Sequence, residues 1–408
     1  MEEEMNIREL KSTQTMLINF VNEFKRHLGR SERVHWCQLY LSGLLLDGER
    51  KSIQPMSQRL PGGNEQALQQ FVNQSPWDHH RIQMDLMSYL KQKLHCQKGI
   101  LVLDDTSLPK KGKHSVGVAR QYCGALGKVS NCQSLVTWHF AQNKGKHFPL
   151  LEELYLPEEW IEDKTRLNRC GVPLSKRQFK KKWELALAML DEIIAQDWAY
   201  EAIVFDAGYG EIKEFRNKLD ERGELFIGQV PESHHFWSHD VAIKKKKAAT
   251  GRPRKYPEIA DKNQKAMSCK AWCRYLLSQG MRWKKIKLPL KSKNYTEVMA
   301  VQVREVNSKW YWRLGNQRWL IIEKMGRNKC KYYVSNASEN TSLKKLVEWA
   351  HERWKIEQGY QQLKEELGLD HFEGRSYTGL HHHVTLCFMA YAFLLLLRER
   401  RIKKTTMK

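Results

Sequence analysis

Three acidic residues of this sequence stand where their side chains could do chemistry together. Asp105 and Asp206 each end a short apolar run, and Glu357 lies in the stretch 350–364, AHERWKIEQGYQQLK. Carboxylate oxygens are ligands that Mg²⁺ prefers. Two such ions about 4 Å apart can activate a water or a hydroxyl for phosphodiester cleavage and transfer. If the three carboxylates converge, the sequence predicts a site for two Mg²⁺ ions, which Mn²⁺ can replace.

Asp104 competes with Asp105 for the first position. Successive side chains of a strand point to opposite faces, so only one of the two can face the metal ions directly. The run before them, Gly99–Leu103, is apolar throughout and predicts a strand buried on both faces. Its periodicity therefore cannot choose between the two, and a supporting or capping role remains open for Asp104.

Basic residues accompany two of the three carboxylates. Lys110, Lys111 and Lys113 follow the first carboxylate in a loop. At about 100° per residue, Arg353 and Lys364 share one rim of the predicted helix with Glu357. Such cations could neutralise the phosphates of a nucleic acid next to the metal ions. The plainer interpretation of the helix is an ordinary surface ladder of Glu and Lys.

The composition favours a polyanionic partner. The 408 residues include 69 Lys+Arg against 46 Asp+Glu, a formal net charge of +23, which indicates nucleic acid. The sequence contains no phosphate-binding P-loop, no GxSxG and no HExxH motif. Its nine cysteines lack zinc-finger spacing and predict reduced thiols in a cytoplasmic protein. We expect no signal peptide, and the apolar run 384–397 predicts a core helix rather than a membrane span.

The elements that must position these residues predict an α/β protein. Residues 1–95 carry apolar residues at helical spacing and predict an N-terminal helical DNA-binding domain, although a scaffold or dimerisation module fits the same pattern. Buried strands and helices alternate over 96–230. Strand-like alternation over 231–335 predicts a β-rich insertion. We expect the helices of 336–397 to complete the core, and 398–408 to form a disordered basic tail.

Some further features allow two interpretations. The segment Thr250–Lys255 resembles a hook that reads the minor groove of DNA, although a solvated loop fits it better. Trp310, Trp312 and Trp319 could stack on bases, but strand tryptophans more often fill a core. Consecutive helical residues point about 100° apart, so His381–His383 cannot chelate one ion together. A position at a helix start or facing DNA is the better expectation for these histidines.

The motifs together resemble the DDE transposases of the insertion-sequence-four-like clan. Arg353, Glu357 and Lys364 match the spacing of its tyrosine–arginine–glutamate–lysine signature. The motifs DDTSLPKKGKHSVGVARQYCG and VFDAGYG look like the two aspartate motifs of the clan. The wording of the motifs is most similar to the insertion-sequence family numbered seven hundred and one, over most of the chain. One departure is that the tyrosine of the signature falls at Ala350.

The resemblance implies a ribonuclease-H-like catalytic core that is interrupted by the β-rich insertion. It implies Asp105, Asp206 and Glu357 as catalytic metal ligands, with Arg353 and Lys364 in contact with the DNA ends. The family's pairing of aspartate with threonine favours Asp105 over Asp104. The implied activity is metal-dependent cleavage of double-stranded DNA at transposon ends and joining to a target, by a homodimer at the nucleoid. The alternatives are a domesticated DNA-binding protein without catalysis and a nuclease without strand transfer.

Overall fold

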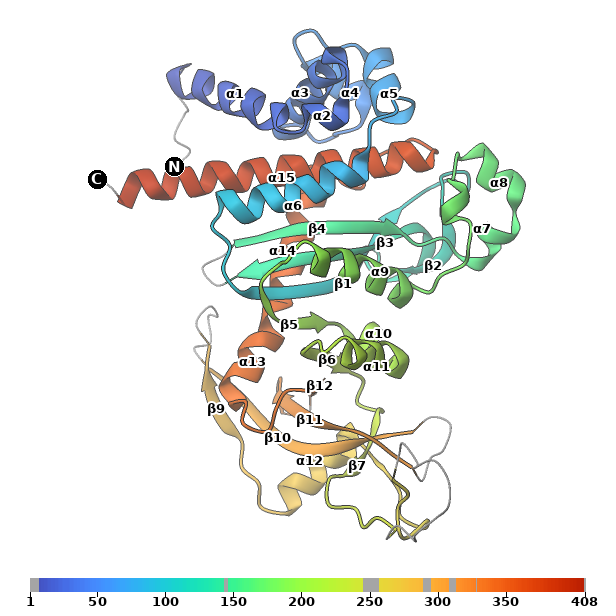
Figure 1. The fold of residues 1–408 in the computed structure, drawn as a ribbon, viewed down its shortest axis with the longest axis vertical. Coiled ribbons are helices and arrows are strands. Elements are labelled where there is room, and N and C mark those ends of the chain that lie inside the picture. The colour runs from blue at the N-terminus through green and yellow to red at the C-terminus, as the bar shows by residue number, and fades with distance from the viewer. Residues whose placement is uncertain are drawn as a thin grey trace. The chain divides into compact units, whose positions relative to one another are not determined.

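The computed structural model describes the chain in the ranges 7–142, 146–244, 257–288, 295–307, 313–327 and 329–406. The chain folds into two compact units, which are coloured along the sequence in Figure 1. The first consists of Met1–Gly99, Leu103–Ala199 and Lys355–Lys408, and the second of Ile100–Val102 and Tyr200–Trp354. The segment Thr250–Lys255, Trp310 and Trp312 lie outside the described residues.

The described part of the N-terminal region is helical, as the spacing of its apolar residues predicts. Its helices are α1 (Ile7–Asn22), α2 (Lys25–Leu28), α3 (Ser31–Leu45), α4 (Ile53–Arg59), α5 (Glu65–Asn73) and α6 (His79–Lys93). The side chains of Asn64 and Asp78 cap the first turns of α5 and α6. Helices α3, α5 and α6 contact the C-terminal helix α15 (Tyr377–Thr406), so they pack into the first unit.

The first unit also contains the start of the sheet. Its strands are β1 (Gly99–Pro109), β2 (Ala119–Cys123), β3 (Lys128–Gln142) and β4 (Lys146–Leu154). The following helices are α7 (Glu158–Glu162), α8 (Lys164–Arg169), η1 (Leu174–Lys176) and α9 (Lys182–Ala195). An irregular segment over residues 177–181 separates η1 from α9. Helix α9 packs on β3, where the Trp138 indole donates to the Ala186 carbonyl at 2.9 Å.

The second unit is a mixed sheet with four helices in its described residues. Its strands are β5 (Tyr200–Phe205), β6 (Phe226–Val230), β7 (His235–Ser238), β8 (Met267–Ser268), β9 (Lys284–Lys287), β10 (Tyr295–Val306), β11 (Leu314–Lys324) and β12 (Cys330–Ser335). Its helices are α10 (Ala207–Gly210), α11 (Lys213–Glu221), α12 (Cys269–Ser278) and α13 (Leu343–Glu352). Strand β12 pairs antiparallel with β6, so the β-rich segment continues the sheet of its own unit. Helix α12 was not indicated by the alternating pattern.

The order of the core strands agrees with the predicted ribonuclease-H-like fold. In the first unit β3 lies between β1 and β4. In the second unit Ile100–Val102 of β1 neighbours β5, which pairs in parallel with β6. Helix α9 follows β4 and precedes β5 in the chain. The α/β class and the ribonuclease-H-like order of strands are therefore as the sequence predicts.

The stretch 350–364 is not the single helix that its periodicity predicts. Helix α13 ends at Glu352, α14 spans Trp354–Gln361, and η2 (Gln362–Glu366) is a π-helical turn. Arg353 between α13 and α14 keeps right-handed helical dihedrals, with φ −55° and ψ −32°. The apolar spacing therefore continues across the interruption, and the sequence pattern does not detect it.

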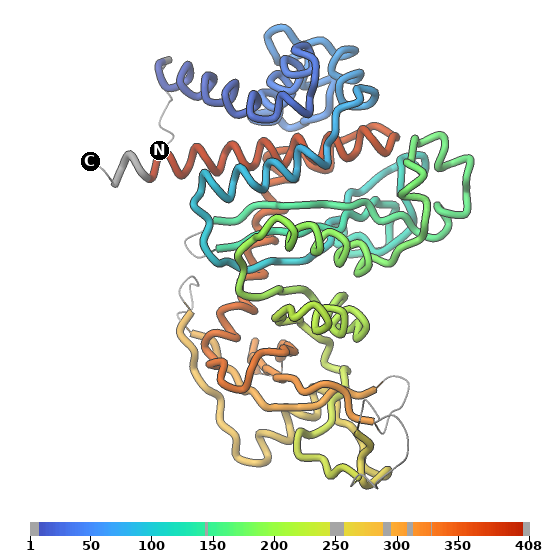
Figure 2. The backbone as a smooth tube through the Cα atoms, viewed as in Figure 1, coloured from blue at the N-terminus to red at the C-terminus, as the bar shows by residue number. Residues whose placement is uncertain are grey.

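The last helix is longer than predicted. Helix α15 continues to Thr406, so the expectation of a disordered tail after Leu397 is wrong for the described residues (Figure 2). Residues 398–406 contain neither Gly nor Pro, and their Arg, Lys and Glu favour a helix. By length and apolarity Tyr377–Ile402 could cross a membrane, yet 83% of its apolar window is buried within the protein. This burial agrees with the prediction of a core helix.

The three histidines of α15 lie in the core. His381, His382 and His383 are at most 1% exposed. His381 Nδ1 is hydrogen-bonded to Glu152 Oε1 at 2.6 Å, and His383 Nδ1 to the Tyr40 hydroxyl at 2.8 Å. The expectation that they face DNA is therefore wrong, because all three imidazoles are buried and each is hydrogen-bonded inside the first unit.

Candidate functional site

The two adjacent aspartates lie within β1 rather than at its end. The strand continues to Pro109. Both aspartates are half-buried, and as neighbours in one strand their side chains point to opposite faces. The Asp105 carboxylate accepts from Lys182 Nζ at 2.6 Å. The Asp104 carboxylate instead interacts electrostatically with the Lys364 ammonium. The two aspartates therefore have different cations as neighbours.

Helix α14 is attached to β1 next to Asp104. The Tyr360 hydroxyl donates to the Asp104 carbonyl oxygen at 3.4 Å and is hydrogen-bonded to the Thr137 hydroxyl. One turn later, Lys364 Nζ donates to the Ser107 carbonyl at 3.1 Å. Glu357 is exposed and precedes Tyr360 by about one turn. Within the first unit, the helix that carries Glu357 is thus held along the strand that carries Asp104.

Asp206 directly follows β5 and belongs to the second unit, as does Arg353. Its carboxylate caps α10, because Oδ1 accepts from Tyr209 N at 3.1 Å. Helix α10 begins directly after Asp206 and ends at Gly210. Asp206 is therefore held at a strand end, as the sequence predicts.

The predicted basic residues differ in their surroundings. Lys110 Nζ donates to the Phe372 carbonyl, and burial lowers the pKa of Lys110 to about 8. Burial also lowers the pKa of Lys364, although nearby carboxylates act in the opposite direction. Lys111 and Lys113 are exposed. The exposed pair can meet a phosphate without first giving up a contact that the structure records.

The described ranges contain no group of three or more His, Cys, Asp or Glu side chains that could hold a metal ion. The donor chemistry suits Mg²⁺, since Asp104, Asp105, Asp206 and Glu357 offer hard carboxylate oxygens. Their arrangement does not form a ligand set within either unit. The convergence of three carboxylates on two metal ions therefore remains a prediction.

The structure adds residues that the sequence did not indicate. Lys182, at the first turn of α9, pairs with Asp105, and nothing in the spacing connects positions 77 residues apart. The Tyr360 hydroxyl is hydrogen-bonded to the Asp104 carbonyl oxygen and to Thr137. Trp319, for which the sequence allows base stacking or a core position, is partly buried, and its indole donates to the Ser338 carbonyl at 3.2 Å.

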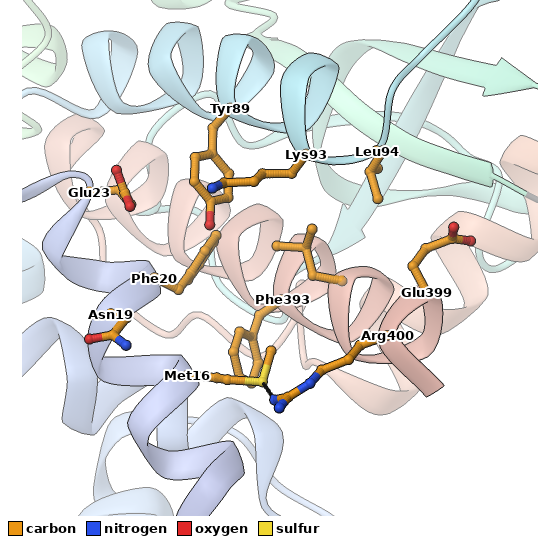
Figure 3. A pocket seen from close by; sticks show the side chains of 11 residues that line it. Met16, Asn19, Phe20, Glu23, Tyr89, Lys93, Leu94, Phe393, Glu399 and Arg400 are labelled. Atoms are coloured by element: carbon orange, nitrogen blue, oxygen red, sulfur yellow. Dashed lines mark hydrogen bonds between the residues drawn. The ribbon is translucent and has the colours of Figure 1, made fainter. Parts of the chain in front are cut away.

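A pocket elsewhere in the first unit holds none of the predicted site residues. It has a volume of about 520 Å³ and opens between α1, α6 and α15 (Figure 3). Phe20, Tyr89 and Phe393 form much of its apolar wall, and Lys93 and Arg400 lie at its edge. This pocket is therefore separate from the residues of the candidate site.

Comparisons with known proteins give the family. A probable transposase for insertion sequence element IS701 from Microchaete diplosiphon is 28% identical over 194 residues, which is 47% of this chain. The chain spans about half the length of this curated relative, 48%. The structure of a piggyBac transposase synaptic complex with hairpin DNA aligns with a TM-score of 0.44 and 9% identity, over 97% of this chain and 77% of that chain. The family model for DDE superfamily endonucleases matches residues 23–293, more than half of the sequence, and the chain therefore belongs to this family.

Proposed function

We propose that this chain is a DNA transposase that binds transposon ends, cleaves the DNA with divalent metal ions and joins the ends to a target. The observation that carries the proposal is the attachment of the Glu357 helix to the Asp104 strand in a member of the DDE superfamily endonucleases. A similarity to a probable transposase supports the choice among endonucleases. The domesticated, non-catalytic protein is the alternative, and the presence of all the acidic residues disfavours it.

We propose Asp104, rather than Asp105, as the metal ligand from β1. Glu357 and Lys364 are seven residues apart, about two turns, and so share one side of their helix. The negative charge of Asp104 raises the pKa of Lys364, against the larger effect of burial, whereas the Asp105 carboxylate is paired with Lys182 of α9. These neighbours support a position of Asp104 on the side of Glu357. The pairing of aspartate with threonine in the family supports Asp105, and the two assignments differ in a measurable way.

In this proposal Asp206 is the third acidic ligand. When bound, Mg²⁺ would activate the attacking oxygen and stabilise the leaving oxygen of the phosphodiester. The protein's own part is to hold the carboxylates in place and to bind the DNA backbone. Lys111 and Lys113 would meet phosphates, together with Lys110, Arg353 and Lys364. The positive net charge of the chain suits such a partner.

A cleavage assay tests this function. The purified protein should cut linear DNA that carries the inverted repeats flanking its gene, and only when Mg²⁺ or Mn²⁺ is present. Joined products should appear when a target plasmid is added, and two ends should be held by a homodimer in the complex. Binding without cutting would support the domesticated alternative. Cutting without joining would support a nuclease.

Replacement of each aspartate separately distinguishes the two assignments. Asp104→Asn should cut more slowly than Asp105→Asn by roughly tenfold or more, since each 1.36 kcal/mol of lost stabilisation is a factor of ten in rate. Asp105→Asn should have a small effect on folding, because a partly exposed ion pair is worth about 0–1 kcal/mol. The measurement is the single-turnover rate of cleavage at saturating protein. The reverse order of rates would assign the ligand to Asp105.

A further inference from the structure

A buried network of charges lies in the second unit. Glu305 Oε1, on β10, accepts from Arg216 Nε at 2.9 Å and from Arg318 Nε at 3.1 Å. These three residues are 1%, 1% and 3% exposed. Arg318 also pairs with Asp220 of α11. Burial raises the pKa of Glu305, but the two guanidinium groups have the larger, opposite effect and lower this pKa to about 2. The carboxylate is therefore ionised at neutral pH, and one of its oxygens, Oε1, accepts from both guanidinium groups.

One arm of this network reaches the turn that follows Asp206. Arg216 Nη1 donates to the carbonyl oxygen of Gly210, the last residue of α10. Asp206 caps the other end of this four-residue helix through Tyr209 N. The guanidinium of Arg216 thus connects Glu305 in the β-rich segment with the end of the helix that Asp206 begins. This connection requires a guanidinium group, because its N–H donors point in different directions and can reach two acceptors at once.

The same turn is fixed from other directions. A Cβ on Gly210 would lie 1.7 Å from the Gln229 carbonyl oxygen of β6, so only glycine permits this approach. Lys213 Nζ, in the first turn of α11, donates to the Val306 carbonyl at the end of β10. Contacts from β6 and β10 therefore leave the turn little freedom. Of these contacts, those made by Arg216 and Lys213 extend to β10.

We propose that Glu305 and Arg216 are positioning residues, through which the β-rich segment holds the turn that carries Asp206. Neither residue needs to touch DNA or a metal ion in this role. The proposal rests on the proposed function, because it takes Asp206 as a catalytic residue. It gives the β-rich segment a function in the second unit besides contact with DNA.

Two variants separate positioning from stability. Arg216→Lys keeps a positive charge next to Glu305, but its single ammonium has no second donor arm for the Gly210 carbonyl. The double variant Glu305→Met with Arg216→Met removes the pair together, and apolar replacement of a buried ion pair is often neutral for folding. Arg318 keeps its partner Asp220 in both variants, and it loses Glu305 only in the double variant. Glu232→Met with Lys270→Met is the matched control, because it removes a 3.0 Å surface pair of the same unit.

The readouts are cleavage of end DNA, binding of the same DNA, and hydrogen exchange of the amides of residues 206–212. Both variants should cleave about 10- to 100-fold more slowly, since a misplacement of 1 Å can cost this much. They should need more Mg²⁺ for half-maximal cleavage, and bind end DNA as before. Exchange at Tyr209 and Gly210 should accelerate. The control should match the unmodified protein in every measurement.

Asp206→Asn distinguishes a failure of this proposal from a failure of the proposed function. If Asp206→Asn abolishes cleavage while both positioning variants cut normally, the proposed function stands and the positioning role is wrong. Unchanged exchange at Tyr209 in a slow variant would also contradict it. If Asp206→Asn itself cuts normally, Asp206 is not catalytic, and the positioning role falls together with that assignment. Should the double variant not fold, Arg216→Lys still decides the question.

Discussion

Glu357→Gln is expected to reduce DNA cleavage by about three orders of magnitude and to leave DNA binding intact. The amide has nearly the shape of the carboxylate but no negative charge to hold a divalent cation. Metal ions contribute several kcal/mol to transition-state stabilisation, and 1.36 kcal/mol is a factor of ten in rate. The side chain is exposed on α14, so the free energy of unfolding should change by less than about 0.5 kcal/mol. The single-turnover cleavage rate and the affinity for end DNA are the two measurements.

Glu365→Gln is the matched control for this prediction. Glu365 is an exposed carboxylate on the same helical segment, and it accepts from Gln361 Nε2 at 2.9 Å. It should cut at the rate of the unmodified protein, because an amide oxygen can still accept that hydrogen bond. If both variants lose activity to the same extent, the effect would come from net charge near the DNA. If Glu357→Gln cuts normally, Glu357 is not a metal ligand.

The sequence predicts the core elements well because their signals are local. The apolar runs at Gly99–Leu103 and Ala202–Phe205 are strands, and the apolar segment 384–397 is a buried helix. The sequence pattern does not reveal the interruption at Arg353, because helical dihedrals persist there and the apolar period does not change. The basic charge of residues 398–406 suggests disorder, whereas their residue types favour the helix that the structure shows.

The candidate site shows where sequence reasoning ends. Residue types and motif spacing identify the acidic residues, but the choice between Asp104 and Asp105 depends on what lies across each face of β1. Lys182 and Lys364 come from distant parts of the chain, and only the fold brings them to the two aspartates. The same limit applies to His381–His383, whose polar composition indicates a surface although their partners lie in the core. Local patterns name candidate side chains, whereas tertiary contacts determine their surroundings.

The second large effect expected is loss of stability in mild acid. Burial lowers the pKa of His147 to about 3 and of His383 to about 4, and it lowers the pKa of His139 well below 6.5. Their neutral forms are hydrogen-bonded. In His383, for example, Nδ1 is hydrogen-bonded to the Tyr40 hydroxyl and Nε2 to the Gly368 carbonyl. In the unfolded chain these imidazoles take up protons near pH 6.5. Unfolding is therefore accompanied by proton uptake below this pH.

The direction of this pH dependence follows from the linkage between proton binding and folding. A histidine whose folded pKa is depressed contributes its full stability above pH 6.5, and this contribution falls as pH drops toward the folded pKa. These three groups alone should cost roughly 4 kcal/mol for each pH unit between about 6 and 5, a large share of the usual 5–15 kcal/mol of a folded protein. The His381 pKa is raised, chiefly by Glu152 against the opposing effect of burial. Its contribution has the opposite sign, since it is present below pH 6.5 and lost as pH rises.

Denaturant unfolding at pH 7, 6 and 5 measures this loss. His383→Gln should be less stable at pH 7 but should show a shallower fall between pH 6 and 5, because one titrating group has been removed. His114→Gln is the control, since His114 is exposed, and its profile should follow that of the unmodified protein. A free energy of unfolding that stays constant from pH 7 to 5 would contradict the lowered pKa values, and one that rises as pH falls over this range would mean that the buried histidines are already protonated in the fold. Their hydrogen bonds to Tyr40 and Tyr391 would then need the opposite assignment of donor and acceptor.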